Sequence, residues 1–324
     1  MVQAACTEEE FIEIWNRHLS VTKVADELKI APRNVQHRRK SIEVRRGIVL
    51  ASPDIRSPSY QATYPQDGVR TKVNLENGIV IVSSDAHYWP GVISTAHRAL
   101  VVAIRELKPK LYIANGDSFD GPTASRHSRI MWESRPTVKQ ELDAVKERKA
   151  EIEDVLKGAE AHWEWGNHDQ RFNSKLSSMV PEFENVAGFN LTDHFPRWKF
   201  SMSTLINGHT MVKHRWHNGV HATWNNVLKA GTSIVTGHLH AMQIRPYTDY
   251  TGTRYAVDTG TLADPTGVQF TYSEDAPANH RSGFAVLTFD SAGRLLYPEL
   301  CEIIDGTAYF RGQKVVSAKR KVAA

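Results

Sequence analysis

Carboxylate, imidazole and amide side chains follow five apolar segments of the chain, at the point where each segment ends. The apolar runs GIVIVSS, LYIAN, HWEW, TMVK and SIVT have the composition of short β-strands. Oxygen and imidazole ligands without nearby thiolates suit divalent cations and disfavour a soft-metal site. The sequence therefore predicts a metal site built from the polar groups that follow these runs, which begin at Asp85, Gly116, Gly166, His214 and Gly237.

The elements that must position these side chains alternate along the chain from residue 76 onward. Helical periodicity predicts helices over 93–108 and 138–157. Strands are expected at 78–84, 111–115, 161–165, 210–214, 233–236, 254–258 and 283–288. Such alternation indicates an α/β fold whose later strands become antiparallel. Because the carboxyl ends of the strands form the ligand crevice in open α/β sheets, the five groups should converge.

In order, the blocks D-x-H, G-D-x-x-D, G-N-H-D, a single H and G-H-x-H resemble the signature of the calcineurin-like metallophosphoesterase superfamily. The resemblance covers roughly residues 78–290, and HRWHNGVHATW is similar to a histidine-rich insertion of phage-encoded members. It implies a β-sandwich flanked by helices, an α+β variant of the α/β class. It also implies two divalent metal ions, with manganese favoured and iron, zinc or nickel as alternatives.

The same resemblance implies how the ligands are divided between the ions. Asp117 would bridge the two; Asp85, His87 and His240 would hold one, and Asn167, His214 and His238 the other. Two ions spaced ~3.5–4 Å apart can generate a hydroxide nucleophile and neutralise phosphate charge. His168 is expected to protonate the leaving oxygen as a general acid. Asp169, its neighbour, is expected to orient the ring and raise its pKa.

Several positions leave alternatives open. Superfamily members often have H-G in the fourth block, where this chain has His214-Arg215, so His217 is an alternative ligand and otherwise a substrate contact. His214 is favoured because it directly follows the strand. Arg126 and His127 either reach a substrate phosphate or belong to an ordinary polar surface. Asp120 either caps a turn or supports a metal ligand. Trp216 and Trp224 could stack on bases, although a role in the core or a pocket wall is the commoner one.

The N-terminal 50 residues have a different character. Helical patterns over 8–19, 21–30 and 33–46 predict two short helices followed by a basic third helix, which is typical of a helix-turn-helix. Solvated basic helices and protein-docking modules have the same pattern. If the module binds DNA, the side chains nearest bases or phosphates are Arg33, Asn34, Gln36, Arg38, Arg39 and Lys40.

The expected organisation is a helix-turn-helix-like module over 1–50, a linker over 51–75, a catalytic domain over 76–305 and a basic tail over 306–324. The two cysteines, Cys6 and Cys301, lie too far apart in the sequence to suggest a disulfide framework. We see no signal peptide and no apolar run of the ~18 residues that a membrane span requires, so we expect a cytoplasmic protein, in the host cytoplasm if it is phage-encoded. A net charge of +4 does not by itself indicate nucleic acid.

Three functions follow from these patterns. The first is a metal-dependent phosphodiesterase, a DNA nuclease targeted by the N-terminal helices. The second is a small-molecule phosphatase or cyclic-nucleotide phosphodiesterase whose N-terminal helices bind a protein partner. The third is a DNA-binding protein with a degenerate metal domain, which the complete set of ligands disfavours.

Overall fold

The computed structural model describes residues 6–50, 69–129, 132–276 and 278–317. The chain forms two compact units, residues 1–65 and 66–324. Most of the expected linker, residues 51–68, lies outside the described residues, as does the end of the expected tail, residues 318–324. In the described part of the chain, no helix is both long and apolar enough to cross a membrane.

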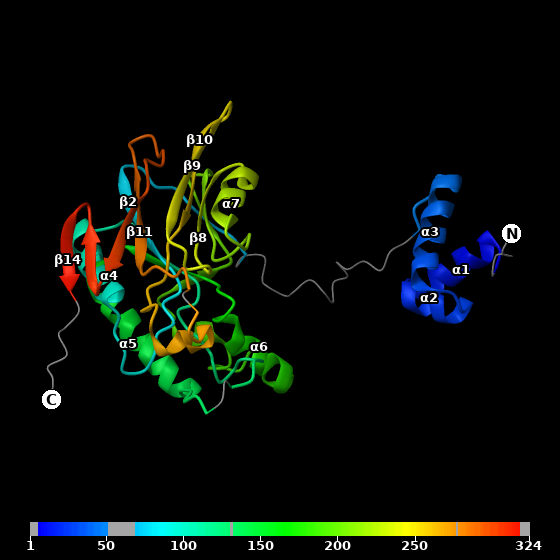
Figure 1. Cartoon of the computed structure of the whole chain (residues 1–324), viewed down its shortest axis with the longest axis horizontal. Coiled ribbons are helices and arrows are strands. Elements are labelled where there is room, and N and C mark those ends of the chain that lie inside the picture. The colour runs from blue at the N-terminus through cyan, green and yellow to red at the C-terminus, as the bar shows by residue number, and fades with distance from the viewer. Residues whose placement is uncertain (1–5, 51–68, 130–131, 277, 318–324) are drawn as a thin grey trace. The chain divides into compact units, whose positions relative to one another are not determined.

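The N-terminal unit consists of three helices, where the sequence predicts them (Figure 1). Their bounds are α1 (Glu8–His18), α2 (Val21–Leu28) and α3 (Pro32–Arg46). Thr7 and Glu10 form a capping box at the start of α1, and Pro32 occupies the first turn of α3, where its missing N–H costs no hydrogen bond. A small core holds the helices together; its fully buried side chains are Phe11, Trp15, Val24, Val35 and Ile42.

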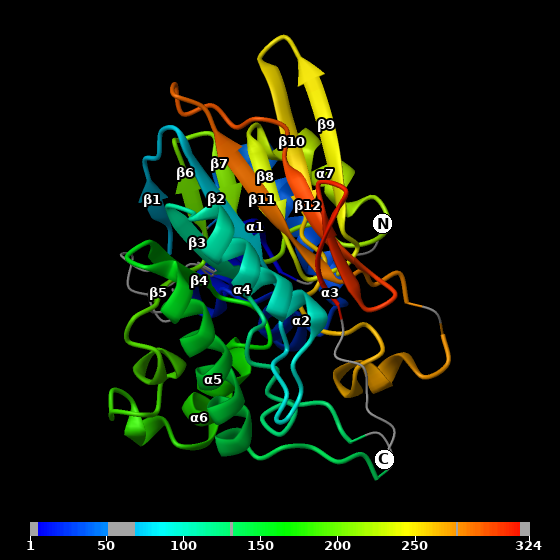
Figure 2. The same cartoon turned by 90° about the vertical axis from the view of Figure 1, so that its left-hand side faces the viewer.

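The larger unit is built on two β-sheets (Figure 2). The six-stranded sheet contains, in spatial order, β1 (Thr71–Val73), β6 (Thr204–Ile206), β7 (Thr210–Val212), β8 (Ser233–Thr236), β10 (Gly252–Asp258) and β9 (Gln243–Asp249). The eight-stranded sheet contains β14 (Gln313–Ser317), β13 (Thr307–Phe310), β12 (Glu299–Ile304), β11 (Gly283–Phe289), β2 (Gly78–Ser83), β3 (Leu111–Asn115), β4 (Glu160–Glu164) and β5 (Lys199–Ser201).

Alternating side chains of the central strands explain why the sheets pack together. Val80 and Val82 of β2 face the core between the sheets, whereas Ile79 and Ile81 face helices on the other side. The helices α4 (Thr95–Leu107) and α5 (Val138–Leu156) cover that outer face (Figure 2). Two further helices are α6 (Gln170–Met179) and α7 (Ala222–Ala230), and α7 packs on β8 and β10. The expected mixed α/β class, a β-sandwich flanked by helices, is confirmed.

The sheet order brings the predicted strand ends together. β2, β3, β4 and β5 are consecutive parallel neighbours, and β7, β8 and β10 are parallel neighbours in the other sheet. The segments that follow β2, β3 and β4 therefore leave one sheet at the same edge. The polar blocks that follow these strands lie in loops rather than in the sheets.

Two expected boundaries were wrong. β1 lies inside the expected linker, because Thr71–Val73 pairs in parallel with β6, more than 130 residues away in the sequence. β13 and β14 lie inside the expected basic tail, where they form an antiparallel hairpin that packs Val315 and Val316 against the core. Local composition could not reveal either pairing, since the partners of β1 are distant and the hairpin carries several charges.

Candidate metal centre

The loops that follow the strands bend sharply at the predicted ligands. Five of these residues have a positive φ, namely Asp85, His87, Asp117, His238 and His240, with φ values between 39° and 72°. This conformation is uncommon outside glycine and costs of order 1 kcal/mol or more at each residue. The surrounding structure must hold it in place, as it does at many functional sites.

Two glycines allow the loops to approach one another. Gly116 has a φ of +85°, and a Cβ atom there would lie 2.3 Å from Nδ1 of His214. A Cβ atom on Gly166 would lie 2.0 Å from Oδ1 of Asp117. Both distances are far shorter than any van der Waals contact, so the glycines of the second and third blocks are needed for close packing around Asp117.

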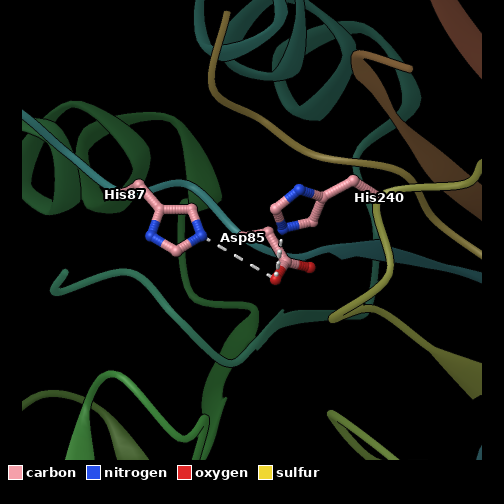
Figure 3. Close-up of side chains that lie close together, drawn as sticks. All are labelled: Asp85, His87 and His240. Atoms are coloured by element: carbon pink, nitrogen blue, oxygen red, sulfur yellow. Dashed lines mark hydrogen bonds and ion pairs between the residues drawn. The ribbon is translucent and has the colours of Figure 1, made fainter. Parts of the chain in front are cut away.

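Asp85, His87 and His240 form the first cluster of possible metal ligands (Figure 3). All three are buried, and Oδ1 of Asp85 lies 3.0 Å from Nε2 of His240 and 3.9 Å from Nε2 of His87. The backbone N–H of His238 donates to the other oxygen of Asp85 at 2.8 Å. That hydrogen bond leaves Oδ1 facing the two imidazoles.

The first cluster has the donors that a cation requires. The Nδ1 atom of His87 lies 2.9 Å from Asp120, which leaves Nε2 to face the cluster. Among the described residues, neither Nε2 of His87 nor Nδ1 of His240 has a hydrogen-bond partner, although both are buried. Unpartnered buried nitrogens are rare in proteins. A histidine that donates one ring N–H to a carboxylate and offers the other nitrogen is the usual arrangement of a metal ligand.

Asp117, His214 and His238 form the second cluster. The Nδ1–H of His214 donates to the Asn115 carbonyl at 2.8 Å, so that Nε2 faces the site. This Nε2 atom lies 3.1 Å from Oδ2 of Asp117 and 3.2 Å from Oδ1 of Asn167. The two clusters adjoin, because the backbone N–H of His238 in the second cluster donates to Asp85 of the first at 2.8 Å. The structure thus brings the seven predicted ligands to one place.

The alternative ligand, His217, lies elsewhere. Its backbone N–H donates to Asn226 at 3.3 Å and its ring lies 4.7 Å from that of Trp216. It belongs to none of the ligand clusters found among the described residues. The geometry therefore favours His214 over His217 as a ligand.

The carboxylates of both clusters remain ionised despite their burial. Burial alone would raise the pKa of Asp117, but the neighbouring His214 and His168 hold that pKa well below its ordinary value. Burial by itself would lower the pKa of His214, but the charges of Asp117 and Asp85 outweigh burial and raise that pKa to about 10. Two buried carboxylates this close together need positive charge between them, which a divalent cation supplies.

The third block contains His168, which lies at the edge of the clusters. Its Nδ1 atom lies 2.6 Å from Oδ1 of Asp120, and Nη2 of Arg171 donates to its Nε2 at 3.1 Å. Burial lowers the pKa of His168, but Asp117 and Asp120 outweigh it, and the net shift is upward. Asp120, for which the sequence left two roles open, thus contacts both His168 and His87 through one oxygen atom.

The expected role of Asp169 was wrong. Its carboxylate accepts backbone N–H groups from Asp117 at 2.8 Å, Phe119 at 2.9 Å and Gly166 at 3.0 Å. It also accepts the indole N–H of Trp163 at 3.0 Å. With its oxygens used in this way, Asp169 ties the second and third loops together, and Asp120 takes the contact to His168 that the sequence assigned to Asp169.

Sequence analysis missed Arg171 and Glu141. Arg171 lies three residues after His168, the spacing that places two side chains on one face of a helix, and this was an available signal. Glu141, in α5, is buried, and its Oε1 atom accepts the N–H groups of Asp120 at 2.5 Å and Gly121 at 2.6 Å. Nothing in the local sequence links Glu141 to a loop twenty residues earlier.

A groove of about 770 Å³ opens beside His168. Its lining includes His168, Arg171, Asp120 and the expected substrate contact His127, together with Arg135, Trp89 and Tyr272. Arg126 is exposed, and it is absent from the lining of this groove as far as the structure describes it. The groove could hold a phosphate ester against His168, with His127 but not Arg126 at its wall.

The six residues expected to contact DNA divide into two groups. Arg33, Asn34, Gln36 and Lys40 are exposed on α3. Arg38 instead donates to the carbonyls of Cys6 and Thr7, and Arg39 donates to Glu43 at 2.9 Å and to the Leu50 carbonyl at 2.8 Å. Both guanidinium groups also lie over aromatic rings of α1, so their contacts are made within the unit, unlike those of the four exposed residues.

The positive charge of α3 is also smaller than its sequence suggests. Arg45 pairs with Glu8, and Arg46 pairs with Glu8 and Glu9. These acidic residues belong to α1, so the charge of the third helix is partly neutralised within the unit.

Comparisons with known proteins find relatives encoded by phages and solved structures with a similar fold. The chain is 28% identical over 228 residues to the Gene 54 protein of Mycobacterium phage L5, a match that covers 64% of this chain and 88% of that protein. The Gene 54 protein of Mycobacterium phage D29 gives the same values. No protein-family model matches the chain.

The solved structures are only distantly similar. Wild-type Vps29 complexed with zinc from Entamoeba histolytica has 12% identity and a TM-score of 0.39, covering 74% of this chain and 99% of that one. A protein serine/threonine phosphatase from Saccharomyces cerevisiae, with similarity to human phosphatase PP5, has 12% identity and a TM-score of 0.37, covering 82% and 96%. The functional argument below depends on the site itself.

Proposed function

We propose that the chain is a metal-dependent phosphodiesterase that acts on DNA. The observation that carries this proposal is the convergence of five strand-end loops, which bring seven oxygen and nitrogen donors into two adjoining clusters that are largely buried. Burying this many ionisable groups is costly unless they bind a charge that balances them. A degenerate domain would have no reason to keep the complete set.

Two divalent ions fit these donors. Asp85, His87 and His240 would hold one, and Asn167, His214 and His238 the other, with Asp117 shared. Ions at such a site lower the pKa of bound water and neutralise charge on phosphate oxygens. Carboxylate, imidazole and amide ligands suit manganese, the ion we favour by resemblance, and also tolerate iron, zinc or nickel.

His168 supplies the proton for the leaving oxygen. Asp120 fixes its ring through Nδ1, so Nε2 is the atom that exchanges a proton at the groove. In the neutral ring, Nε2 accepts a hydrogen bond from Arg171. Protonation of Nε2 removes that acceptor, and the guanidinium of Arg171 is then free to bind a phosphate oxygen in the same groove.

The N-terminal unit would bring the enzyme to DNA. Arg33, Asn34, Gln36 and Lys40 are the exposed side chains of α3 that could contact bases or phosphates, and the arrangement of α2 and α3 supports a helix-turn-helix role. The phage relatives support action inside a bacterial host cell.

The test is direct. Purified protein is incubated with supercoiled plasmid, linear duplex and single-stranded DNA in the presence of manganese, beside an Asp117→Asn variant. We expect nicking or degradation by the wild-type protein alone. DNA that stays intact while a small nitrophenyl diester is hydrolysed would contradict DNA as the substrate and leave the phosphodiesterase standing.

That second outcome would favour a small-molecule phosphatase or cyclic-nucleotide phosphodiesterase, with the N-terminal helices binding a protein partner. One observation supports this alternative, because the groove of about 770 Å³ has the size of a pocket for a small ligand. Hydrolysis of cyclic nucleotides with a kcat/KM well above that for the nitrophenyl diester would establish the cyclic-nucleotide alternative.

A further inference from the structure

Two lysines lie on the outer face of the six-stranded sheet, near the end of β7, and an arginine lies two residues from each of them in the chain. Val73 of β1 and Val212 of β7 pack into the core between the sheets. Because successive side chains of a strand point to opposite faces, Lys72 and Lys213 point outward. Arg70 lies two residues before Lys72 on the same side, and its Nε atom lies 3.4 Å from Ser203, at the start of β6. Arg215 follows in the exposed loop after β7.

The positive charges of this group are not balanced. Among the residues that the structure describes, none of the four forms an ion pair, in contrast to Arg45 and Arg46 of the N-terminal unit. Lys72 and Lys213 belong to neighbouring parts of one sheet, since β1 pairs with β6 and β6 pairs with β7. An anion bound between these like charges would offset their repulsion.

An exposed aromatic ring adjoins these cations. Trp216 keeps 40% of its surface exposed, so part of its ring is open to solvent. Its ring packs against His217, and Nζ of Lys213 lies 5.9 Å from its centre. Trp216 follows the metal-site residue His214 by two positions, which keeps its backbone within about 7 Å of the backbone of that residue.

We propose that Arg70, Lys72, Lys213, Arg215 and Trp216, here called the cationic platform, bind a single-stranded segment of polynucleotide next to the phosphodiester that is cleaved. The proposal rests on the proposed function. A base can stack on Trp216 while the cations contact successive phosphates, the combination typical of proteins that bind single strands. An acidic protein would match the charges but would leave the exposed indole without a partner.

The experiment compares two variants with equal changes in charge. The platform variant carries Arg70→Gln, Lys72→Gln and Arg215→Gln; Lys213 is kept because it is partly buried, whereas the other three cations are exposed. The control variant carries Arg105→Gln, Lys146→Gln and Lys314→Gln, all exposed on α4, α5 and β14. For each protein, kcat/KM is measured on a single-stranded oligonucleotide and on a nitrophenyl diester that is too small to reach the platform.

In the platform variant we expect the ratio of oligonucleotide to diester activity to fall at least ~10-fold, and the salt dependence of binding to weaken by about 0.7 per lost phosphate contact. Trp216→Leu should lower the same ratio without changing the salt dependence, because stacking does not release counterions. An equal fall in the control variant would show a general charge effect and overturn the platform.

The failures of the two proposals can be told apart. Suppose that the wild-type protein hydrolyses the diester and that the platform variant cleaves the oligonucleotide as fast as the wild type does. The proposal of the cationic platform is then wrong, whereas the proposed phosphodiesterase function is not contradicted. If the wild-type protein hydrolyses neither substrate, the proposed function is wrong. Affinity for the oligonucleotide, measured in an Asp117→Asn background, then decides on the platform, and equal affinity in the platform and control variants would overturn it.

Discussion

Oδ1 of Asp120 lies 2.6 Å from Nδ1 of His168. The same oxygen lies 2.9 Å from Nδ1 of His87, a predicted metal ligand, so one buried carboxylate orients both the proposed acid and a ligand. Hydrogen bonds from the two rings hold the pKa of Asp120 below its ordinary value against the effect of burial. Asp120 therefore stays ionised and can fix both imidazoles.

Replacing Asp120 with Asn should weaken both functions of this carboxylate. The amide lacks the negative charge and cannot accept the two ring N–H groups equally well. We expect activity on diesters to fall by about 10–100-fold and bound metal to decrease, as for other residues that support metal ligands. Activity and metal content are measured on the same preparation, and normal values for both would contradict the role of Asp120.

His168→Ala should slow turnover without releasing metal. A lost general acid costs ~10²–10⁴-fold on a substrate with a poor leaving group. A nitrophenyl leaving group needs little protonation, so the loss there should be much smaller. Rates on an unactivated dinucleotide and on the nitrophenyl diester provide the comparison, and equal losses on both would exclude the acid role.

Asp117→Asn and His240→Ala should each abolish turnover and lower the metal content. Asp117 belongs to the second cluster and His240 to the first, so the two variants test both halves of the site. Elemental analysis after dialysis measures the metal, and the exposed substitution Asp143→Asn is the control. Full activity in either variant would show that the ligand assignment is wrong.

Glu141→Gln should change how stability depends on pH. Burial, and then the charge of Asp120, raise the pKa of Glu141 to about 8. Between about pH 5 and 8 the folded chain therefore keeps a proton that an unfolded Glu releases, and this contribution to stability falls as pH rises through that window. Gln keeps an oxygen for the N–H groups of Asp120 and Gly121 without ionising.

The stability of the Glu141→Gln variant relative to the wild-type protein should therefore increase as pH rises. Since one pKa unit corresponds to about 1.4 kcal/mol, the difference in free energy of unfolding should change by more than ~1 kcal/mol between pH 5 and 8. Urea unfolding at both pH values measures it. A difference that stays constant with pH would mean that Glu141 is ionised throughout.

Deleting residues 1–50 should separate targeting from chemistry. The N-terminal unit has its own core and forms a compact unit apart from the sandwich. We expect the deletion to spare hydrolysis of the nitrophenyl diester and to weaken salt-sensitive binding of duplex DNA. If DNA affinity is unchanged at several salt concentrations, the N-terminal unit does not bind DNA and docks another partner.

The strands of the sandwich and the set of candidate ligands could be predicted from the sequence. β2, β3 and β11 are buried on both faces and read as short apolar runs. Because parallel strands end at a common edge, a polar residue directly after such a run is already placed near the others. Asp85, Asp117 and His214 all have this position in the sequence.

Contacts between side chains could not be predicted in the same way. Adjacency in the sequence suggested Asp169 as the partner of His168, but the loops turn at residues of positive φ and send Asp169 toward backbone N–H groups. The acidic partners of Arg45 and Arg46 lie about 37 residues earlier in the chain, so the sequence of α3 alone could not show that its charge is partly neutralised.

The sequence by itself thus determined which strands form and which side chains follow them, because burial and alternation are local patterns. Only the tertiary structure decided that Asp120 holds His168, that Asp169 ties two loops together, and that Lys72 and Lys213 share a face with Arg70. The physical reason is that a hydrogen bond or a shared surface depends on where separate loops and strands meet in space. A one-residue change in a loop redirects a side chain while leaving the composition of its segment almost unchanged.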